Sequence, residues 1–214
     1  MAVSHTDSGS TKDDKAKLRS ELRRRRSELG FVVGSVESQR AASAVADATL
    51  QVPAVQNARS IAVYAARGKE FDPSLIVERL RPGQVVSYPR VVTYDPPALA
   101  FHAVSLPELV PAGFDLVEPD ATAELAPSID VFVVPGLGFD RCGRRLGQGK
   151  GFYDAALRRT PSAVRVGIGY DFQLVSEIPV EECDEPLDFI ITPTQKLATG
   201  ARACVFRSAK EDIS

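Results

Sequence analysis

The sequence predicts an α/β protein in which a mostly parallel sheet is flanked by helices in three layers. The first observation is the continuous apolar run 130–135, which is typical of a strand buried on both faces of a parallel sheet. The second is the alternation of strand-like and helix-like segments after residue 60. The third is a glycine-rich segment that follows the strongest strand and precedes a helical pattern. Together these observations favour helices packed on both faces of one sheet.

The elements follow in order from periodicity and from residues that start or stop them. Residues 1–11 are polar and predict a disordered tail, and residues 12–214 predict a single domain. Asp72 and Pro73 indicate a helix start, with Asp72 as the N-cap, whereas Pro89 predicts the end of a strand. The remaining helices are expected at 12–29, 35–50 and 151–159, and the strands at 61–65, 85–88, 99–104, 130–135, 164–168 and 188–192.

Composition narrows the class of protein. The formal net charge of −2 provides no overall attraction to nucleic acid or to anionic membranes. Three widely spaced cysteines form no C-x-x-C pair, which argues against a structural zinc site and a disulfide framework. The polar first fifteen residues lack the apolar core of a signal peptide. We therefore expect a cytoplasmic monomer with small-molecule partners and with no nucleic-acid or membrane partner.

The segment 135–154 carries the chemistry that the sequence indicates. Its glycines at 147, 149 and 151 alternate immediately before a predicted helix, where backbone amides and the helix dipole form an anion site. Lys150, Arg144 and Arg145 add positive charge. In sheets of this kind, ligands bind beyond the carboxyl ends of the strands. The segment therefore predicts phosphate binding, and the alternative is a flexible surface turn with solvated arginines.

Two common phosphate-binding motifs are excluded. A Walker A loop needs glycine at position 144 and Ser or Thr at 151, where this chain has Arg144 and Gly151. The dinucleotide fingerprint G-x-G-x-x-G also fails, because the spacing here is G-x-G-x-G.

Two aspartates are candidate magnesium ligands. Asp154 falls in the first turn of the helix after the loop, where it either favours the helix dipole or holds Mg²⁺ beside bound phosphate. Asp184 lies in an acidic loop and is a possible second ligand, although such a loop is equally typical of a solvated turn.

Several segments of the chain resemble the 5-formyltetrahydrofolate cyclo-ligase family. The specific part is 134–140 together with 145–154, which reads Arg-Leu-Gly-Gln-Gly-Lys-Gly-Phe-Tyr-Asp. Shorter matching pieces lie at 15–19, 61–64 with Glu70, 88–90, 114–119 and 178–184, so the resemblance covers most of the chain.

The resemblance implies ATP-dependent conversion of 5-formyltetrahydrofolate to 5,10-methenyltetrahydrofolate, with release of ADP and phosphate. It also implies a fold related to the phosphosugar isomerase and CoA-transferase group. Lys150, Arg145 and Tyr153 are the expected catalytic residues, and Asp154 and Asp184 the expected Mg²⁺ ligands. Folate contacts are expected at Glu70, Gln148, Gly149, Lys150, Gly151 and Phe152. ATP contacts are expected at Lys15, Ala16, Lys17, Leu18 and Arg19, and at Arg145, Leu146, Gly147, Gln148, Gly149, Lys150, Gly151, Phe152 and Tyr153.

The residue types suit this chemistry. Phosphoryl transfer depends on positioning and charge stabilisation, which glycine amides and a lysine supply. Glu70 would accept hydrogen bonds from the N–H groups of the pterin ring. The alternative interpretation is that Glu70 is a solvated acid at the surface. Phe152 and Cys183 depart from the family, which usually has Tyr and often His there. Phe152 lacks a hydroxyl, and Cys183 weakens the inference that Asp184 binds metal.

Other features suggest less. The run 23–26 of four arginines is flanked by glutamates and lacks aromatic neighbours, so a solvated helix face is the better interpretation than a nucleic-acid site. His5 and His102 have no partners recognisable from sequence, which leaves a hydrolase triad unsupported. The rival functions are an isomerase or CoA-transferase-like enzyme that uses no ATP and a catalytically silent folate- or nucleotide-binding module.

Overall fold

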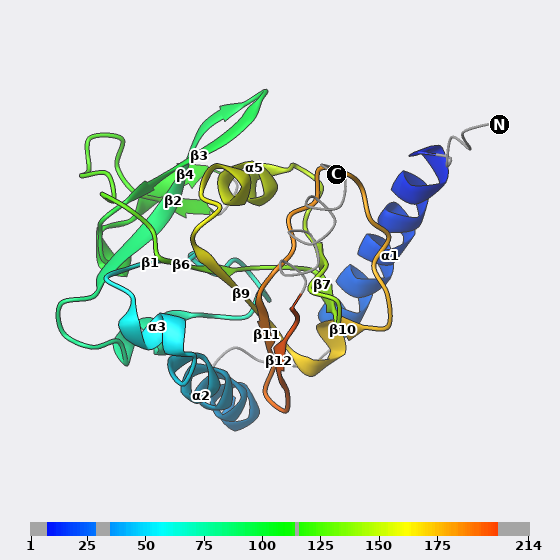
Figure 1. Ribbon diagram of the computed structural model, residues 1–214, viewed down its shortest axis with the longest axis horizontal. Helices are drawn as coiled ribbons and strands as arrows, with labels where there is room; N and C mark the ends of the chain where they lie inside the picture. The colour runs from blue at the N-terminus through cyan, green and yellow to red at the C-terminus, as the bar shows by residue number, and fades with distance from the viewer. Residues whose placement is uncertain (1–7, 29–34, 114–115, 201–214) are drawn as a thin grey trace, which may run out of the picture.

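A seven-stranded sheet forms the centre of the protein in the computed structural model, which describes residues 8–28, 35–113 and 116–200 (Figure 1). The strand order is β12-β11-β9-β6-β1-β2-β3. Neighbours from β11 to β2 pair in parallel, and only the two edge pairs, β11–β12 and β2–β3, are antiparallel. This arrangement confirms the mostly parallel sheet. The bounds are β1 Ser60–Ala62, β2 Val85–Tyr94, β3 Pro97–His102, β6 Val131–Val134, β9 Val164–Ile168, β11 Phe189–Ile191 and β12 Lys196–Ala198.

The two faces of β6 pack into separate apolar clusters. Val131 and Val133 belong to a cluster with residues of α2 (Val36–Leu50), α3 (Pro53–Asn57) and α4 (Ser74–Glu78). Phe132 and Val134 belong to a second cluster with residues of α5 (Phe152–Arg159). Figure 1 shows α2 and α3 below the sheet and α5 above it. The strand has no polar side chain because both of its faces are covered, which confirms the three-layer α/β prediction.

The strand predicted to stop at Pro89 instead continues to Tyr94. Pairing of β2 with β1 ends at Ser87, and from Tyr88 onwards β2 pairs only with β3. Pro89 therefore lies where β2 has a partner on one side, and its missing N–H interrupts no hydrogen bond with β1. The prediction was wrong because sequence alone does not show that an inner strand becomes an edge strand.

The helices differ from the predictions at their starts. Helix α1 spans Ser8–Glu28, so residues 8–11, which we expected in a disordered tail, are helical, and residues 1–7 lie outside the described part. Serine and threonine, which suggested disorder, are also common at helix starts. The helix predicted to begin after Asp72 begins at Ser74, and the Asp72 carboxylate accepts the backbone N–H of Ser74 at 2.9 Å.

Part of the predicted glycine-rich loop forms a hairpin in a second, three-stranded sheet. Strands β7 (Gly138–Asp140) and β8 (Arg145–Leu146) pair antiparallel, and β10 (Leu174–Val175) pairs with β7. The buried Asp140 side chain closes the hairpin by accepting the backbone N–H groups of Cys142, Arg144 and Ile178. The remaining elements are β4 (Val110–Gly113), β5 (Leu116–Glu118) and the 3₁₀ turns Leu106–Glu108 and Asp171–Gln173.

Helix α1 packs beside this small sheet rather than on the central one. Leu22 is buried with Leu137, Leu146 and Ile178, and a Cβ atom at Gly138 would lie 2.6 Å from a methyl carbon of Leu22. The close approach requires glycine at 138. Because Leu22 and the partly buried Leu18 are the apolar residues of α1 in this cluster, they hold the helix against the loop that follows β8.

We expect Leu22→Ala to lower the free energy of unfolding by about 2 to 4 kcal/mol, because it removes buried methyl groups and leaves a cavity under α1. Urea titration followed by circular dichroism measures the effect. The control is Val92→Ala at a side chain that is 63% exposed, where a change below about 0.5 kcal/mol is expected. Equal effects of the two substitutions would show that α1 is not anchored through Leu22.

Candidate functional site

The loop 147–151, which the sequence predicted as the site, joins β8 to α5. Gly149 and Gly151 have φ angles of +93° and +71°, which only glycine adopts without strain. At Gly147 a Cβ atom would lie 2.6 Å from Nη1 of Arg145. The alternating glycines thus let the loop turn sharply over a buried arginine. Gln148, Gly149, Lys150 and Gly151 are exposed and available to a ligand.

Arg145 forms the charged floor of this loop. Its side chain is 5% exposed, and its Nη2 lies 2.9 and 3.0 Å from the two carboxylate oxygens of Asp154. Its guanidinium carbon lies 5.7 Å from the centre of the Tyr153 ring, within the range of a cation–π contact. Its Nε is buried and has no hydrogen-bond partner among the described residues. Arg145 therefore interacts with Asp154 and Tyr153 beneath the glycine-rich loop.

Lys15 of α1 is buried between two acids of the loop 178–185. Its side chain is 2% exposed, and its Nζ lies 2.8 Å from Glu181 Oε2 and 2.5 Å from Asp184 Oδ2. The hydrogen bond from Lys15 lowers the pKa of Glu181 below its ordinary value. The backbone N–H of Glu181 also donates to Asp184 Oδ2 at 2.8 Å. The acidic loop, for which the sequence left a solvated turn open, is thus tied to α1.

The loop that carries Asp184 contacts Asp154 through its backbone. The backbone N–H of Glu185, which follows Asp184, donates to Asp154 Oδ1 at 3.4 Å. The side chains of Asp154 and Asp184 are 21% and 26% exposed. In the described part of the chain, no group of three or more His, Cys, Asp or Glu has a metal-binding arrangement. Magnesium takes one or two carboxylates and completes its shell with water and phosphate oxygens, so two partly exposed aspartates suit the donor set that the ion needs.

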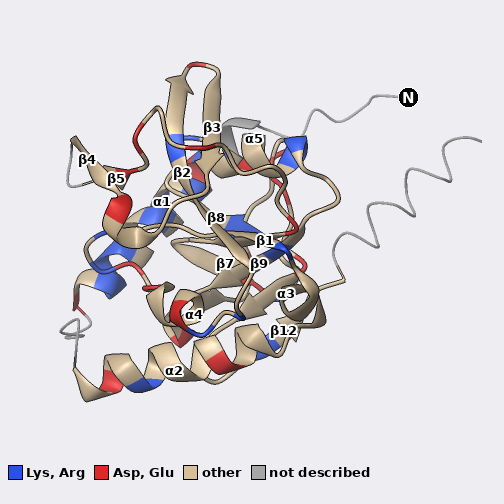
Figure 2. Cartoon of the chain, turned by 90° about the vertical axis from the view of Figure 1, so that its left-hand side faces the viewer, with Lys and Arg blue, Asp and Glu red and all other residues tan. Residues whose placement is uncertain are grey.

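The basic face of α1 lies along the glycine-rich loop. Arg19 Nε donates to the carbonyl of Gly147 at 3.0 Å, and Arg23 Nη2 donates to the Gln148 side chain at 2.9 Å. Lys and Arg positions, blue in Figure 2, recur along this helix. Of the five residues 15–19, the structure brings only Lys15 and Arg19 to the loops. Ala16 and Lys17 lie on the exposed side of α1, and Leu18 packs in the apolar cluster with Leu22.

The arginine run 23–26 divides into two pairs, which corrects the interpretation as a wholly solvated face. Arg24 and Arg25 form exposed ion pairs with Glu28 and Glu21 of the same helix, as a solvated face would. Arg23 and Arg26 instead point to other segments. Arg26 Nη1 lies 4.0 Å from Glu70 Oε1.

Glu70 lies in the turn between β1 and α4 and faces Arg26 of α1. Its Oε2 accepts the backbone N–H of Arg67 at 3.2 Å. Burial raises the pKa of Tyr153, Arg145 opposes the rise, and the negative charge of Glu70 adds to it. Burial likewise raises the pKa of Tyr64, and Glu70 contributes. Through its contact with Arg26, Glu70 is joined to the helix that also donates to Gly147 and Gln148.

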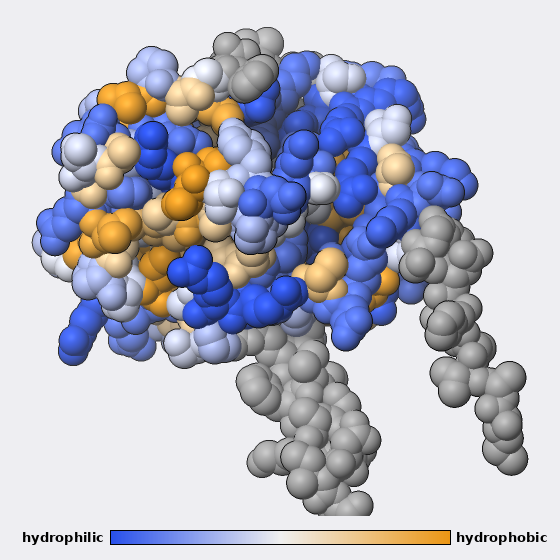
Figure 3. All heavy atoms as spheres, turned by 90° about the horizontal axis from the view of Figure 1, so that it is seen from above, coloured by the Kyte–Doolittle hydropathy of each residue, from blue (hydrophilic) through white to orange (hydrophobic). Residues whose placement is uncertain are grey.

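Phe152 packs against a tyrosine of the β2–β3 hairpin. The rings of Phe152 and Tyr94 are 5.6 Å apart and meet edge to face. Tyr94 is 70% exposed and Val92 63%. Figure 3, which views this side from above, shows hydrophobic residues gathered on the left and a mostly hydrophilic surface on the right. The ring at 152 therefore forms an apolar rim to the loop.

The remaining candidates lie elsewhere. Arg144 Nη1 lies 3.1 Å from Glu177 Oε1, so its charge is paired with an acid outside the loop 147–151. The buried His102 contacts the carbonyl of Ala123 through Nδ1 at 2.8 Å, which is a structural role. Cys142 and Cys183 are free and exposed; Cys204 and His5 lie outside the described residues.

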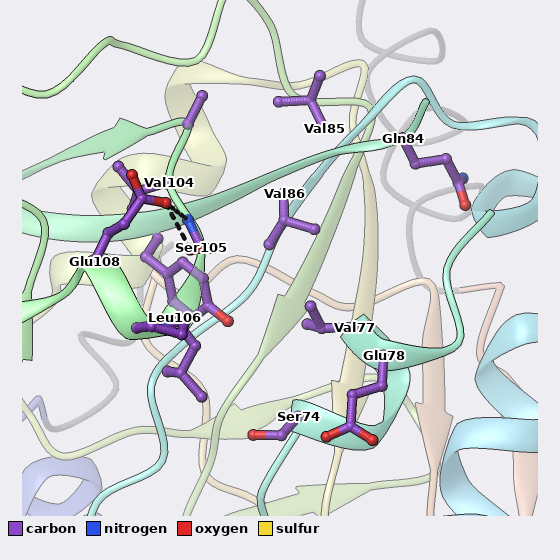
Figure 4. A pocket seen from close by; sticks show the side chains of 13 residues that line it. Ser74, Val77, Glu78, Gln84, Val85, Val86, Val104, Ser105, Leu106 and Glu108 are labelled. Carbon is purple, nitrogen blue, oxygen red and sulfur yellow. Dashed lines mark hydrogen bonds between the residues drawn. The ribbon is translucent and has the colours of Figure 1, made fainter. Parts of the chain in front are cut away.

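A separate apolar cleft of about 580 Å³ lies at the amino end of β2 (Figure 4). Val77, Val86, Val104 and Leu106 line it, with Glu78 at its edge. None of the predicted catalytic, ligand-binding or metal-binding residues lines this cleft. It opens at the opposite end of the sheet from the carboxyl end of β6.

Sequence reasoning missed three residues of the site. Glu181 is the second acid that pairs with Lys15. Its position three residues before Asp184 is the sequence feature that could have indicated this role. Arg23 and Arg26 were hidden in a run whose neighbouring glutamates explain the charges equally well. No local pattern indicates that these two arginines reach Gln148 and Glu70, which lie far along the chain.

The fold and the loop define an α/β protein with a basic, glycine-rich anion site at the carboxyl end of its central strand. The model of the 5-formyltetrahydrofolate cyclo-ligase family matches residues 11–193. The cyclo-ligase of Escherichia coli K12 is 36% identical over 152 residues, which is 67% of this chain and 82% of that protein. The cyclo-ligase of Saccharomyces cerevisiae is 29% identical over 199 residues, 81% of this chain and 92% of that protein. The chain therefore belongs to the 5-formyltetrahydrofolate cyclo-ligase family.

Solved structures agree with this assignment. The NMR structure of the 5,10-methenyltetrahydrofolate synthetase of Aquifex aeolicus superposes with a TM-score of 0.70 at 25% identity, covering 86% of this chain and 92% of that one. The Mycoplasma pneumoniae synthetase shares the fold, with a TM-score of 0.64 at 24% identity and coverage of 84% and 99%. No helix in the described part is both long and apolar enough to cross a membrane. The predicted cytoplasmic location, monomeric state and relation to phosphosugar isomerases stay predictions.

We expect Arg145→Ala to lower the free energy of unfolding by about 2 to 4 kcal/mol, because it leaves Asp154 without its buried partner. Thermal and urea unfolding measure the loss. Arg24→Ala is the matched control, since Arg24 pairs with Glu28 at the surface, and such pairs contribute about 0.3 to 0.5 kcal/mol. Similar losses in both variants would contradict a special role for the Arg145–Asp154 pair.

Proposed function

We propose that the protein catalyses the ATP-dependent conversion of 5-formyltetrahydrofolate to 5,10-methenyltetrahydrofolate, with release of ADP and phosphate. The observation that carries this proposal is the meeting of three segments at one place. The loop 147–151 offers glycine amides and Lys150, α1 brings Arg19 to the same loop, and Arg26 of the same helix faces Glu70. Family membership supports the reaction, since the curated relatives bear its name.

The reaction explains why ATP is required. A formamide carbon is a poor electrophile, and its oxygen does not leave as oxide. Transfer of the γ-phosphoryl group to the formyl oxygen converts it into a leaving group. N10 of the folate then attacks the formyl carbon, the C–O bond breaks, phosphate departs, and N10 loses its proton. Such a sequence needs positioned charge more than covalent help from the protein.

The phosphates are assigned to the exposed surface of the loop. Lys150 extends from its tip and forms no ion pair with any described residue, so its charge is available to phosphate oxygens. The amides of Gly149 and Gly151 lie at the start of α5, where the helix dipole favours an anion. Arg19 is anchored on the Gly147 carbonyl through Nε, which leaves the rest of its guanidinium beside the loop. We assign Arg145 a supporting role because it is buried under Gly147 and paired with Asp154.

Asp154 and Asp184 are the residues that would hold Mg²⁺. When bound, the ion would neutralise charge on the phosphate oxygens. The pairing of Asp154 with Arg145 and of Asp184 with Lys15 fixes the directions of both carboxylates. Each keeps part of its surface exposed toward solvent, which leaves room for a shared ligand.

The folate is assigned to the side of the loop nearest Glu70. The Glu70 carboxylate would accept hydrogen bonds from the amino and ring N–H groups of the pterin. The Gln148 side chain adds an amide, and the ring of Phe152 provides an apolar surface that is held by Tyr94. Because Phe152 has no hydroxyl, it contributes packing only.

One assay tests the proposal directly. Purified protein is mixed with Mg-ATP and 5-formyltetrahydrofolate, and the near-ultraviolet absorbance of the methenyl product is followed. We expect a rise that depends on ATP and stops when EDTA removes Mg²⁺. Binding of both ligands without a rise would favour a silent binding module instead. A rise without ATP would contradict the ATP-dependent mechanism, and binding of neither ligand would remove the functional assignment altogether.

We expect Lys150→Ala to reduce turnover by roughly a hundredfold or more, because one preorganised charge on the transferring group is lost. Folding should be unchanged, since the side chain is exposed. Steady-state kinetics and thermal unfolding provide the two measurements. Lys196→Ala removes an exposed lysine from edge strand β12 and serves as the control. Unchanged turnover of the Lys150 variant would exclude Lys150 from phosphate binding.

A further inference from the structure

Four basic side chains lie on one face of α1. At about 100° per residue, positions 15, 19, 23 and 26 fall within an arc of about 80°, and at about 1.5 Å per residue they span about 16 Å. Lys15 reaches the acidic loop, Arg19 and Arg23 reach the glycine-rich loop, and Arg26 faces Glu70. Arg24 and Arg25 fall outside this arc. One helix therefore contacts each of the three segments assigned to the site.

Arg26 differs from its neighbours in burial and in partner. Its side chain is 19% exposed, against 60% for Arg24 and 47% for Arg25. Those two pair within the helix, whereas Arg26 faces an acid 44 positions further along the chain. Lys69, next to Glu70, donates from Nζ to the carbonyl of Ser27 at 2.8 Å. The end of α1 is thus joined to the Glu70 turn by two contacts.

The Glu70 carboxylate is held from two sides. Its Oε2 accepts the backbone N–H of Arg67 at 3.2 Å, and its Oε1 faces Arg26 Nη1 at 4.0 Å. The second distance is too long for a direct hydrogen bond, so Oε1 keeps its capacity to accept from a ligand. The Glu70 side chain is 20% exposed, which makes the attraction stronger than between solvated charges.

The residue after Glu70 in sequence, Phe71, belongs to a group of aromatic side chains. Phe71 and Tyr170 meet edge to face at 4.9 Å, and Tyr170 stacks on Phe172 at 5.9 Å. Burial raises the pKa of Tyr170, Asp72 raises it further, and Arg26 opposes the rise. The charge of Arg26 therefore acts on Tyr170 as well as facing the Glu70 carboxylate.

We propose that Arg26 is a positioning residue that orients the Glu70 carboxylate toward the pterin ring of the substrate, an inference that rests on the proposed function. Arg26 attracts Oε1 without occupying it. The Arg67 amide fixes the other oxygen, and rotation of the carboxylate is restricted. Loss of Arg26 frees the carboxylate to turn, so folate binding weakens while the phosphate end of the site is unaffected.

Kinetics of Arg26→Ala test this role. The KM for 5-formyltetrahydrofolate is expected to rise roughly tenfold, while the KM for Mg-ATP stays unchanged. Arg26→Lys should recover part of the loss because it keeps the charge. Arg24→Ala, which removes the same charge from the far face of α1, should change neither constant. Equal rises in both KM values for Arg26→Ala, or an equal effect of Arg24→Ala, would overturn the proposal.

A double-mutant cycle shows whether Arg26 acts through Glu70. In a Glu70→Ala background, Arg26→Ala should raise the folate KM by less than about twofold. A rise as large as in the unaltered protein would mean that Arg26 acts independently of Glu70. Calorimetric titration of 5-formyltetrahydrofolate into the four proteins of the cycle repeats the comparison without turnover. Absence of turnover in the unaltered protein would refute the proposed reaction alone, whereas an additive cycle with normal turnover would refute the role of Arg26 alone.

Discussion

The buried ammonium group of Lys15 is the constraint on which the arrangement of the site depends. A lysine removed from water is costly unless acids receive it, and Glu181 and Asp184 both do. This contact fixes α1 over the acidic loop, while Leu22 fixes the same helix on the small sheet. The two anchors lie on the same side of the helix, about 20° apart around its axis and about 10 Å apart along it, so together they hold that side of α1 inward. The directions of Arg19, Arg23 and Arg26 follow from that.

The anchored helix joins segments that the fold alone would leave apart. The Glu70 turn follows β1, the glycine-rich loop follows β8, and the acidic loop precedes β11. Parallel pairing aligns the ends of β1 and β6 at one edge of the sheet, but it does not set the distances between these three segments. Hydrogen bonds from α1 to Gly147 and Gln148 and the ion pair with Glu70 set them. The proposed site for ATP and folate therefore depends on a helix outside the central sheet.

The sequence predicted what depends on local patterns. The buried strand at β6, the helix at α5 and the glycines before it were all readable from periodicity and residue type. The extension of β2 through Pro89 was not, because it depends on where β1 stops pairing. The sequence did not predict the hairpin of β7 and β8. Its turn is closed by the buried side chain of Asp140, and sequence alone does not distinguish this aspartate from one at the surface.

The same limit applies to the site. Position and glycine spacing identified the loop and Lys150, because an anion site there needs only local backbone geometry. Partners of charged residues were not predictable, since any arginine can pair with any acid that the fold brings near. Arg24 and Arg26 are two positions apart in one run, yet one is a surface charge and the other faces Glu70.

The charge pairs also decide which groups remain for an anionic ligand. Arg145 was expected to add a free charge to the loop, but Asp154 already balances it, and Lys15 is balanced by Glu181 and Asp184. Neutralised pairs contribute little net attraction to phosphate. The attraction must come from Lys150, the amides of the loop and the part of Arg19 that Gly147 leaves free. These groups lie on the exposed surface of the loop, where a large nucleotide can reach them. The buried ion pairs beneath the loop give it a fixed shape. Arg145 and Lys150 are both basic and lie five positions apart, yet the first supports the loop and the second is available to a ligand.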